Sequence, residues 1–269
     1  MTGLTFRKRA EPEERLDLSP LVPARLAGLS ELQIAAIPVG TSRFGLTVGD
    51  VFEVVGDDPS SIRFAGGSTR FDRIGEAMQA GGIVVEGDAG ARLGRAMSGG
   101  RISVEGSVGG HAGSGMSGGV IRIGGDAGER LGGPLAGEMT GMKGGTIVVS
   151  GSAGPRAGDR MRRGVISIDG NAGTDVGSRM IAGTIIVSGT AAGTPGRLMK
   201  RGTLLLCNGA ETLAPTFLDN GPADLLILTV MARDFAAGEV GPVAFEGMAM
   251  RRLGGDTAVL GLGEIFLPC

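Results

Sequence analysis

The side chains best suited to chemistry in this sequence are arginines that gather in neighbouring copies of a repeated pattern. The group comprises Arg156, Arg160, Arg162, Arg163, Arg179 and Arg201, with Lys200 beside the last. Guanidinium groups bind carboxylates and phosphates through paired hydrogen bonds. A spacing of nineteen residues aligns Arg160 with Arg179, and two such steps align Arg163 with Arg201, so these pairs lie on one side of the molecule. The pattern predicts an interface or polyanion-binding strip; the alternative is a solvated charged face.

Other reactive side chains form no recognisable constellation. His111 is the only histidine, and its place is taken by Arg92 and Arg130 in neighbouring repeats, which argues against a catalytic base. No histidine, cysteine or carboxylate cluster has metal-ligand spacing, and no serine lies in a nucleophile elbow. Glycine patterns similar to the dinucleotide-binding motif recur in every repeat without a following strand–helix unit. We expect no catalytic, metal-binding or cofactor-binding residue in this chain.

A nineteen-residue repeat determines the elements that carry the arginines. Each copy opens with two apolar residues, mostly branched, separated by one position, as in Ile83 and Val85 or Ile166 and Ile168. This spacing places both side chains on one face of a short strand, and the glycine content of 53 residues disfavours helix. The intervening position varies, and its residues are Val84, Ser103, Arg122, Val148, Ser167, Ile186 and Leu205.

Strands this short need partners, and the partner of each is the same strand one circuit later. Successive strands are then parallel, and the handedness preference of parallel crossovers predicts a right-handed turn. The fold class is therefore all-β: a single-stranded right-handed parallel β-helix with about nineteen residues per turn. Methionine recurs at this period, from Met78 to Met199. We interpret this column as adaptable core filling rather than a ladder of soft-metal ligands.

The repeats predict three regions: an N-terminal cap over 1–60, the glycine-rich β-helix over 61–209, and a C-terminal cap over 210–269. Caps are needed because a bare terminal turn exposes a strand edge. We expect cap strands over 4–6, 34–39, 51–56, 258–260 and 265–267, and a helix over 222–236 that starts at a proline. The third repeat is seven residues longer, so a loop near 137–143 is either an interface or a neutral insertion.

Composition limits the kinds of partner and the cellular compartment that we expect for this protein. The net charge of −2 gives no support for a nucleic-acid partner. Two cysteines do not make a disulfide framework, the first residues lack the apolar run of a signal peptide, and the apolar stretch at 225–230 is too short to span a bilayer. We expect a cytoplasmic protein without a membrane partner.

The unit Gly-x-x-Gly-x-x-x-Gly, found at 87–94 and 170–177, resembles the β-helix shared by two protein groups. One is the C-terminal domain of glutamate synthase large subunits, and the other is the C subunit of formylmethanofuran dehydrogenase. The segments 48–54, 215–217, 254–256 and 261–264, with the whole-chain length, are more similar to the stand-alone C subunit. The resemblance covers essentially the whole chain.

The resemblance implies a structural subunit whose catalytic partners are other chains of a hetero-oligomeric complex. In the bacterial relative, a formyltransferase/hydrolase complex, a formyl group passes from tetrahydromethanopterin to a methanofuran-type carrier and is released as formate during formaldehyde oxidation. Composition rich in arginine and alanine favours this relative over the tungsten or molybdenum dehydrogenase of archaea, which is kept as an alternative. A glutamate-synthase-type domain and an independent β-helix enzyme are further alternatives.

Two contacts follow from this interpretation. The bacterial carrier has an acidic polyglutamate tail, which the arginine strip is suited to bind. The variable strand positions Val84, Val148, Ile186 and Leu205 form an apolar column, which we expect to lie under a partner subunit.

Overall fold

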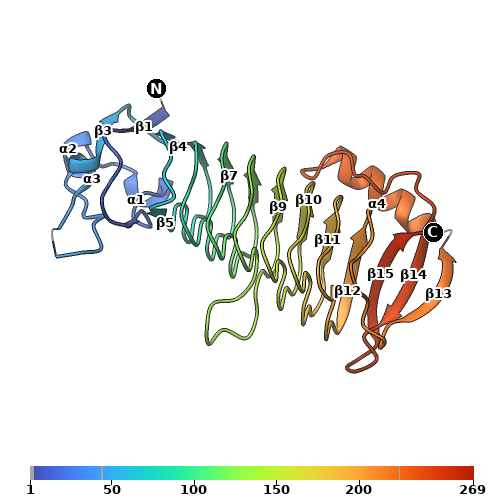
Figure 1. The fold of residues 1–269 in the computed structure, drawn as a ribbon. Coiled ribbons are helices and arrows are strands. Elements are labelled where there is room, and N and C mark those ends of the chain that lie inside the picture. Colours follow the sequence, from blue (N-terminus) through green and yellow to red (C-terminus); the bar gives the residue numbers. More distant parts are fainter. Residues whose placement is uncertain (1–2, 44, 224) are drawn as a thin grey trace.

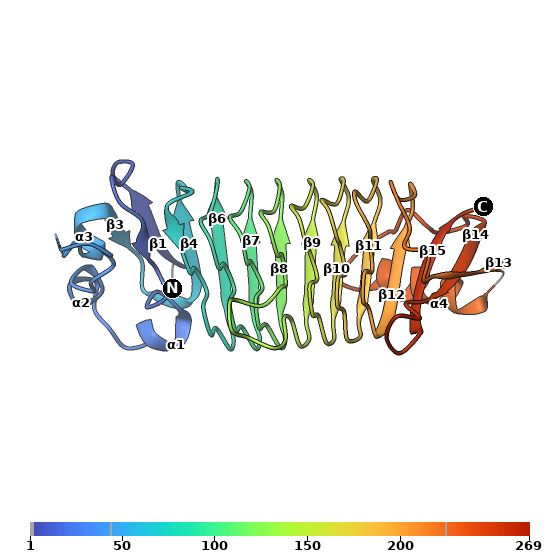
Figure 2. The ribbon, with the colours of Figure 1, turned by 60° about the horizontal axis from the view of Figure 1, so that its bottom comes forward.

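A computed structural model describes residues 3–43, 45–223 and 225–269 of the chain. Met1, Thr2, Phe44 and Asp224 lie outside the described residues, so parts of the predicted N-terminal cap and of the predicted helix over 222–236 are not described. The described chain is mostly β and contains a thirteen-stranded, mostly parallel sheet. Figures 1 and 2 show an elongated stack of similar turns with a more irregular unit at each end.

The middle of the chain is a stack of parallel strands, as the repeat predicts. These strands are β4 (Asp58–Ala65), β6 (Gly82–Glu86), β7 (Arg101–Val104), β8 (Val120–Ile123), β9 (Thr146–Val149), β10 (Val165–Ile168), β11 (Thr184–Val187) and β12 (Arg201–Leu206). Ile83 pairs with Ile102, Ile102 with Ile121, and the register continues without a slip to Leu204. A second line of parallel bridges runs from Ala89 through Val108 to Ala210. This arrangement is consistent with a β-helix.

Aliphatic and methionine side chains fill the interior of the stack. The paired strand residues from Ile83 to Leu206 are at most 2% exposed. The methionines of the repeat column are at most 1% exposed; they are Met78, Met97, Met116, Met142, Met161, Met180 and Met199. Glycine is required where a methionine meets the next turn. A Cβ added to Gly119, whose φ is +84°, would lie 2.6 Å from Met97 Cε and 2.7 Å from the Gly100 carbonyl oxygen. The methionine column is therefore core, as the sequence predicts.

A column of short polar side chains links the turns at one corner. Asp88 Oδ1 accepts a hydrogen bond from the Ser107 backbone N–H at 2.8 Å, and Ser107 Oγ accepts one from the Asp126 N–H at 3.0 Å. The pattern continues through Ser152, Asn171 and Thr190. Each side chain thus accepts a hydrogen bond from a backbone N–H of the following turn. No β-bridge satisfies that N–H.

The N-terminal unit closes the stack with aromatic side chains. It contains β1 (Gly3–Lys8), β2 (Leu16–Asp17), α1 (Pro23–Leu26), α2 (Glu31–Ala35), α3 (Val48–Val51), β3 (Phe52–Val55) and β5 (Phe71–Asp72). β1 pairs in parallel with β4, and Phe6 stacks on Phe64 with ring centroids 5.1 Å apart. The strands expected over 4–6 and 51–56 are confirmed as β1 and β3. The strand expected over 34–39 is wrong, because α2 begins at a capping box between Ser30 and Gln33.

The C-terminal unit extends the sheet and reverses its direction. β15 (Leu262–Pro268) pairs in parallel with β12, followed by the antiparallel strands β14 (Met250–Gly255) and β13 (Leu218–Ala223). The strand expected over 265–267 is confirmed within β15, whereas residues 258–260 form a turn rather than a strand. The helix exists, but α4 spans Leu226–Ala237 and Pro222 belongs to β13. Proline is tolerated there because β13 is an edge strand.

The C-terminal unit also folds back over the outward face of the stack. Ile186 and Leu205, both 0% exposed, pack in one cluster with Leu228 and Ala232 of α4. Beyond the helix, the Glu239 carboxylate accepts hydrogen bonds from Arg101 at 2.6 Å and from Arg122 at 3.2 Å. The prediction of a partner subunit over this column is therefore wrong for Ile186 and Leu205, which are covered by their own chain. Figure 1 shows α4 lying beside the stack near β11 and β12. Val148 is also buried, while Val84 is half-buried.

Candidate docking site

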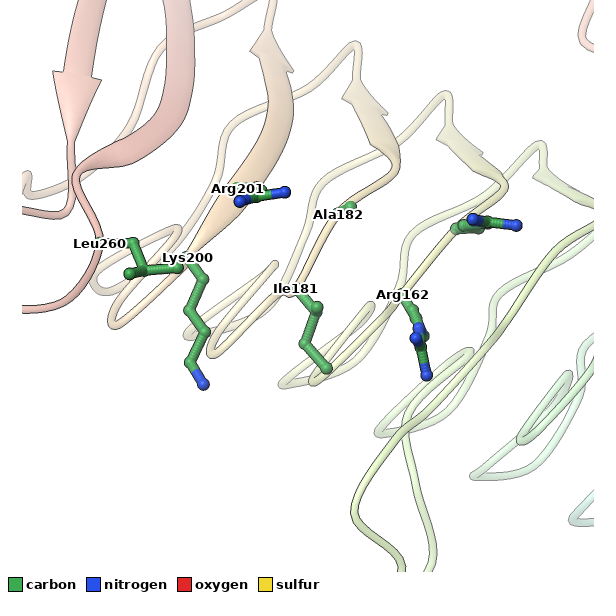
Figure 3. Close-up of a pocket in the computed structure, with 7 residues that line it drawn as sticks. Arg162, Ile181, Ala182, Lys200, Arg201 and Leu260 are labelled. Carbon is green, nitrogen blue, oxygen red and sulfur yellow. The ribbon is translucent and has the colours of Figure 1, made fainter.

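A shallow basic cleft lies where three consecutive turns enter β10, β11 and β12. Its volume is about 290 Å³, and its lining consists of Arg162, Arg163, Ile181, Ala182, Lys200, Arg201 and Leu260. The chain reaches each strand through a glycine in the left-handed region, such as Gly164 at φ +99°, so residues just before it face outward. Figure 3 shows Arg162 and Lys200 projecting in the same direction on either side of Ile181.

Four cations and no carboxylate line this basic cleft. Arg162, Arg163, Lys200 and Arg201 are all exposed, and within the described residues none of them forms an ion pair. Arg162 and Lys200 lie two turns apart, and so do Arg163 and Arg201. Two turns correspond to about 10 Å at the usual spacing of parallel strands. Ile181 and Ala182 occupy the turn between them, and Leu260 lies at the C-terminal end. The basic cleft therefore combines an apolar floor with two rows of positive charge.

The other predicted arginines have different roles. Arg179 donates to both oxygens of Asp159, from Nε at 3.0 Å and from Nη2 at 2.9 Å. The Asp159 side chain is 1% exposed, so this pair is a structural bridge between adjacent turns. Arg160 donates from Nη1 to the Glu138 carbonyl at 3.0 Å and thereby holds the inserted loop. Arg156 is half-buried and, within the described residues, its side chain has no ion pair or hydrogen bond.

Only part of this arrangement follows from the sequence. The nineteen-residue spacing correctly places Arg163, Ala182 and Arg201 in one row. No sequence signal indicates Leu260, which comes from the connection between β14 and β15. Sequence reasoning also misses the role of Asp159, although it lies one turn before Ser178, whose hydroxyl donates to it at 3.0 Å.

Elsewhere, the described residues show little reactive chemistry. Burial, followed by the nearby charge of Arg130, lowers the pKa of His111. Burial raises the pKa of the Cys207 thiol to about 11, which keeps it protonated at neutral pH. The described residues contain no group of three or more histidine, cysteine or acidic residues able to hold a metal ion. None of the described helices is long and apolar enough to cross a membrane.

Comparison with known proteins covers both the stack and its two end units. The chain is 57% identical over 264 residues to the C subunit of the formyltransferase/hydrolase complex Fhc of Methylorubrum extorquens, across 98% of this chain and 99% of the relative. The chain belongs to the family of Fhc C subunits. A solved structure, the FhcABCD complex of Methylorubrum extorquens with methylofuran, contains a chain that superposes with a TM-score of 0.94 and 45% identity over 98% of this chain and 99% of that one.

A second relative matches a shorter stretch of the chain. The C subunit of the molybdenum-containing formylmethanofuran dehydrogenase 1 of Methanosarcina barkeri is 36% identical over 81 residues, which cover 28% of this chain and 27% of the relative. No family model matches the sequence. The family of Fhc C subunits therefore accounts for the whole chain, whereas the similarity to the dehydrogenase is confined to part of it.

Proposed function

We propose that this chain is a structural, non-catalytic subunit of a formyltransferase/hydrolase complex. Such a complex would transfer a formyl group from tetrahydromethanopterin to a methanofuran-type carrier and release formate. The observation that carries the proposal is the similarity over 98% of the chain, which includes both end units. The interior of the stack is a packed aliphatic core, which suits a rigid support. We assign the complex to the cytoplasm and infer a right-handed stack from the preference of parallel crossovers.

The division into 1–60, 61–209 and 210–269 remains part of this proposal. The first and last regions would close the stack and present side chains to neighbouring subunits, while the middle region sets the distance between them. The archaeal-type dehydrogenase is a second candidate, favoured by the match of 81 residues to the Methanosarcina barkeri protein. Its limited coverage makes it the weaker of the two.

We assign the basic cleft to an acidic segment in the same complex. An extended chain advances about 3.3 Å per residue and points every second side chain to the same face, so carboxylates two and four residues apart, at about 7 and 13 Å, span the spacing of cations two turns apart. A polyglutamate tail on the methanofuran-type carrier offers such a series of carboxylates and is our preferred occupant. Of the predicted arginines, Arg162, Arg163 and Arg201 remain in this proposal with Lys200. Arg160 and Arg179 do not, because their side chains are committed to Glu138 and Asp159.

Assembly and tail binding are tested in one strain of Methylorubrum extorquens that lacks its own Fhc C subunit. A tagged copy of this chain is expected to co-purify with the other subunits of the complex and to restore formyl transfer and hydrolysis. Isolation of the chain alone, or with molybdenum-enzyme subunits, contradicts the assignment. The parent complex is expected to release carrier as salt rises, whereas the double variant Arg163→Glu/Arg201→Glu is expected to assemble but to hold little carrier even at low salt. Arg233→Glu, an exposed charge on α4, is the matched control and should behave like the parent.

A further inference from the structure

A small cavity lies under the inserted loop between β8 and β9, on a different part of the stack from the basic cleft. Its volume is about 300 Å³, and its lining consists of Arg95, Ala96, Ser114, Gly115, Glu138, Met139, Thr140 and Lys143. The loop leaves the stack after Gly132 and returns at Met142, where the N–H of Met142 bonds the Gly132 carbonyl. The cavity therefore exists because the extra residues interrupt the repeat.

The interruption removes one hydrogen bond from a regular series. At this column each turn donates a backbone N–H to a carbonyl of the next turn; the donors are Ala77, Ala96, Gly141, Arg160 and Arg179, at 2.8 to 3.0 Å. Gly115 occupies the same column with a φ of +66°, yet within the described residues its N–H has no acceptor. A Cβ built on Gly115 would meet no atom within 4 Å, so its surroundings are open.

Two buried side-chain donors in the same cavity also lack partners. Ser114 is 0% exposed, and its hydroxyl has no hydrogen-bond partner within the described residues. Arg95 Nε is buried and unpartnered as well, although the other nitrogens of this guanidinium donate to Glu76 at 2.9 Å and to Glu138 at 2.7 Å. Buried donors without acceptors each cost roughly 1–3 kcal/mol, so two such donors around one cavity, beside the half-buried Gly115 N–H, indicate an absent acceptor.

The charges around the cavity favour an anion as that acceptor. Glu138 is already satisfied, because one oxygen accepts from Arg95 and the other from the Leu135 N–H at 3.0 Å. Lys143 is exposed at the rim and, within the described residues, forms no ion pair. Of the charged residues that line the cavity, Arg95 and Lys143 are positive and Glu138 is negative, so positive charge is in excess.

We propose that this cavity binds a single carboxylate group. Its two oxygens offer enough lone pairs for the Ser114 hydroxyl, the Gly115 N–H and Arg95 Nε together, and Lys143 supplies the countercharge at the entrance. The carboxylate belongs either to a small free acid or to an acidic side chain inserted by a neighbouring subunit. In both cases the same donors hold it.

Acetate is the probe, with sodium chloride used to keep the ionic strength constant. Titration calorimetry on the purified full-length chain is expected to show one acetate site, and Ser114→Ala is expected to weaken it at least tenfold. Ser117→Ala, an exposed serine of the same turn, is the matched control and should bind like the parent chain. Gly115→Ala is the second variant: Ala77 and Ala96 already adopt its backbone conformation, so the added methyl group narrows the space beside the Gly115 N–H without unfolding the turn.

The assembled complex distinguishes the two sources of the carboxylate, and this arm alone rests on the proposed function. Acetate binding to both the chain and the complex identifies a free acid, whereas binding to the chain but not to the complex identifies a side chain of a neighbouring subunit. The proposal is overturned if acetate does not bind the chain, or if Ser114→Ala and Gly115→Ala bind it as well as Ser117→Ala does.

Discussion

Replacing Leu205 with alanine tests whether the outward face of the stack is sealed by its own chain. Leu205 is 0% exposed and packs in the cluster that contains Leu228 and Ala232 of α4. Fully buried leucine-to-alanine changes cost about 2.7–5.0 kcal/mol, and the thin cover of a single helix places this one near 3 kcal/mol. With an unfolding entropy of about 2.1 cal/mol/K per residue, a chain of 269 residues should lose about 5 °C in Tm.

Thermal unfolding of the isolated full-length chain, followed by circular dichroism, measures this effect. Leu226→Ala is the matched control, because Leu226 begins the same helix but is 78% exposed. It should change the free energy of unfolding by less than about 0.5 kcal/mol, or about 1 °C. If the Leu205 and Leu226 variants unfold at the same temperature in the isolated chain, the face is not covered by α4, and a partner subunit becomes the better explanation of the apolar column.

Two further predictions concern buried charge. Arg179→Ala should destabilise the chain by about 3 kcal/mol, because it leaves the buried Asp159 carboxylate without its main partner. Asp159→Asn should cost less, because the freed Arg179 guanidinium reaches water. Equal losses of unfolding free energy in denaturant titrations contradict this difference. The lowered pKa of His111 means that the unfolded chain binds its proton more readily, so stability should fall as pH drops below about 6.5. His111→Asn should flatten this part of the pH–stability curve, and an unchanged curve refutes the role of His111.

The stacked strands are predictable because each turn repeats the same requirement. Ile83 and its successors are read from period-two apolar pairs, and the structure pairs them in register because any slip would expose a fully buried column. The loop near 137–143 is predictable for the same reason, because a turn of nineteen residues cannot accommodate seven more and must extend them outward. The period of the methionine column likewise identifies it as core.

The end units are harder to predict because nothing in them repeats. The apolar run from Ile34 favours a strand, although Ser30 and Gln33 carry the signature of a helix start. Pro222 suits the first position of a helix as well as an edge strand, and only its pairing opposite Arg251 decides between them. Local sequence therefore cannot decide whether Pro222 lies in a helix or in an edge strand, because the answer depends on pairing with a distant strand.

The covering of the outward face is beyond sequence reasoning for a different reason. An apolar column that includes Ile186 and Leu205 predicts burial but not the identity of the covering element, which can belong to the same chain or to another. The corner column from Asp88 to Thr190, in contrast, carries a signal that could have been used. Short side chains with hydrogen-bond acceptors recur there at the same nineteen-residue interval, apart from the longer third repeat.

The unbroken register from Ile83 to Leu204 makes the length of this protein adjustable in fixed increments. In the sheet each of these strands pairs only with the strands before and after it. Duplicating the turn that starts at β6, which lies ahead of the strands that Glu239 binds, would leave the width and both ends unchanged. The two end units would simply move apart by about 4.8 Å, with a small rotation. The stack therefore sets the distance between whatever binds at one end and whatever binds at the other. Duplicating the codons of a single turn changes that distance by one step.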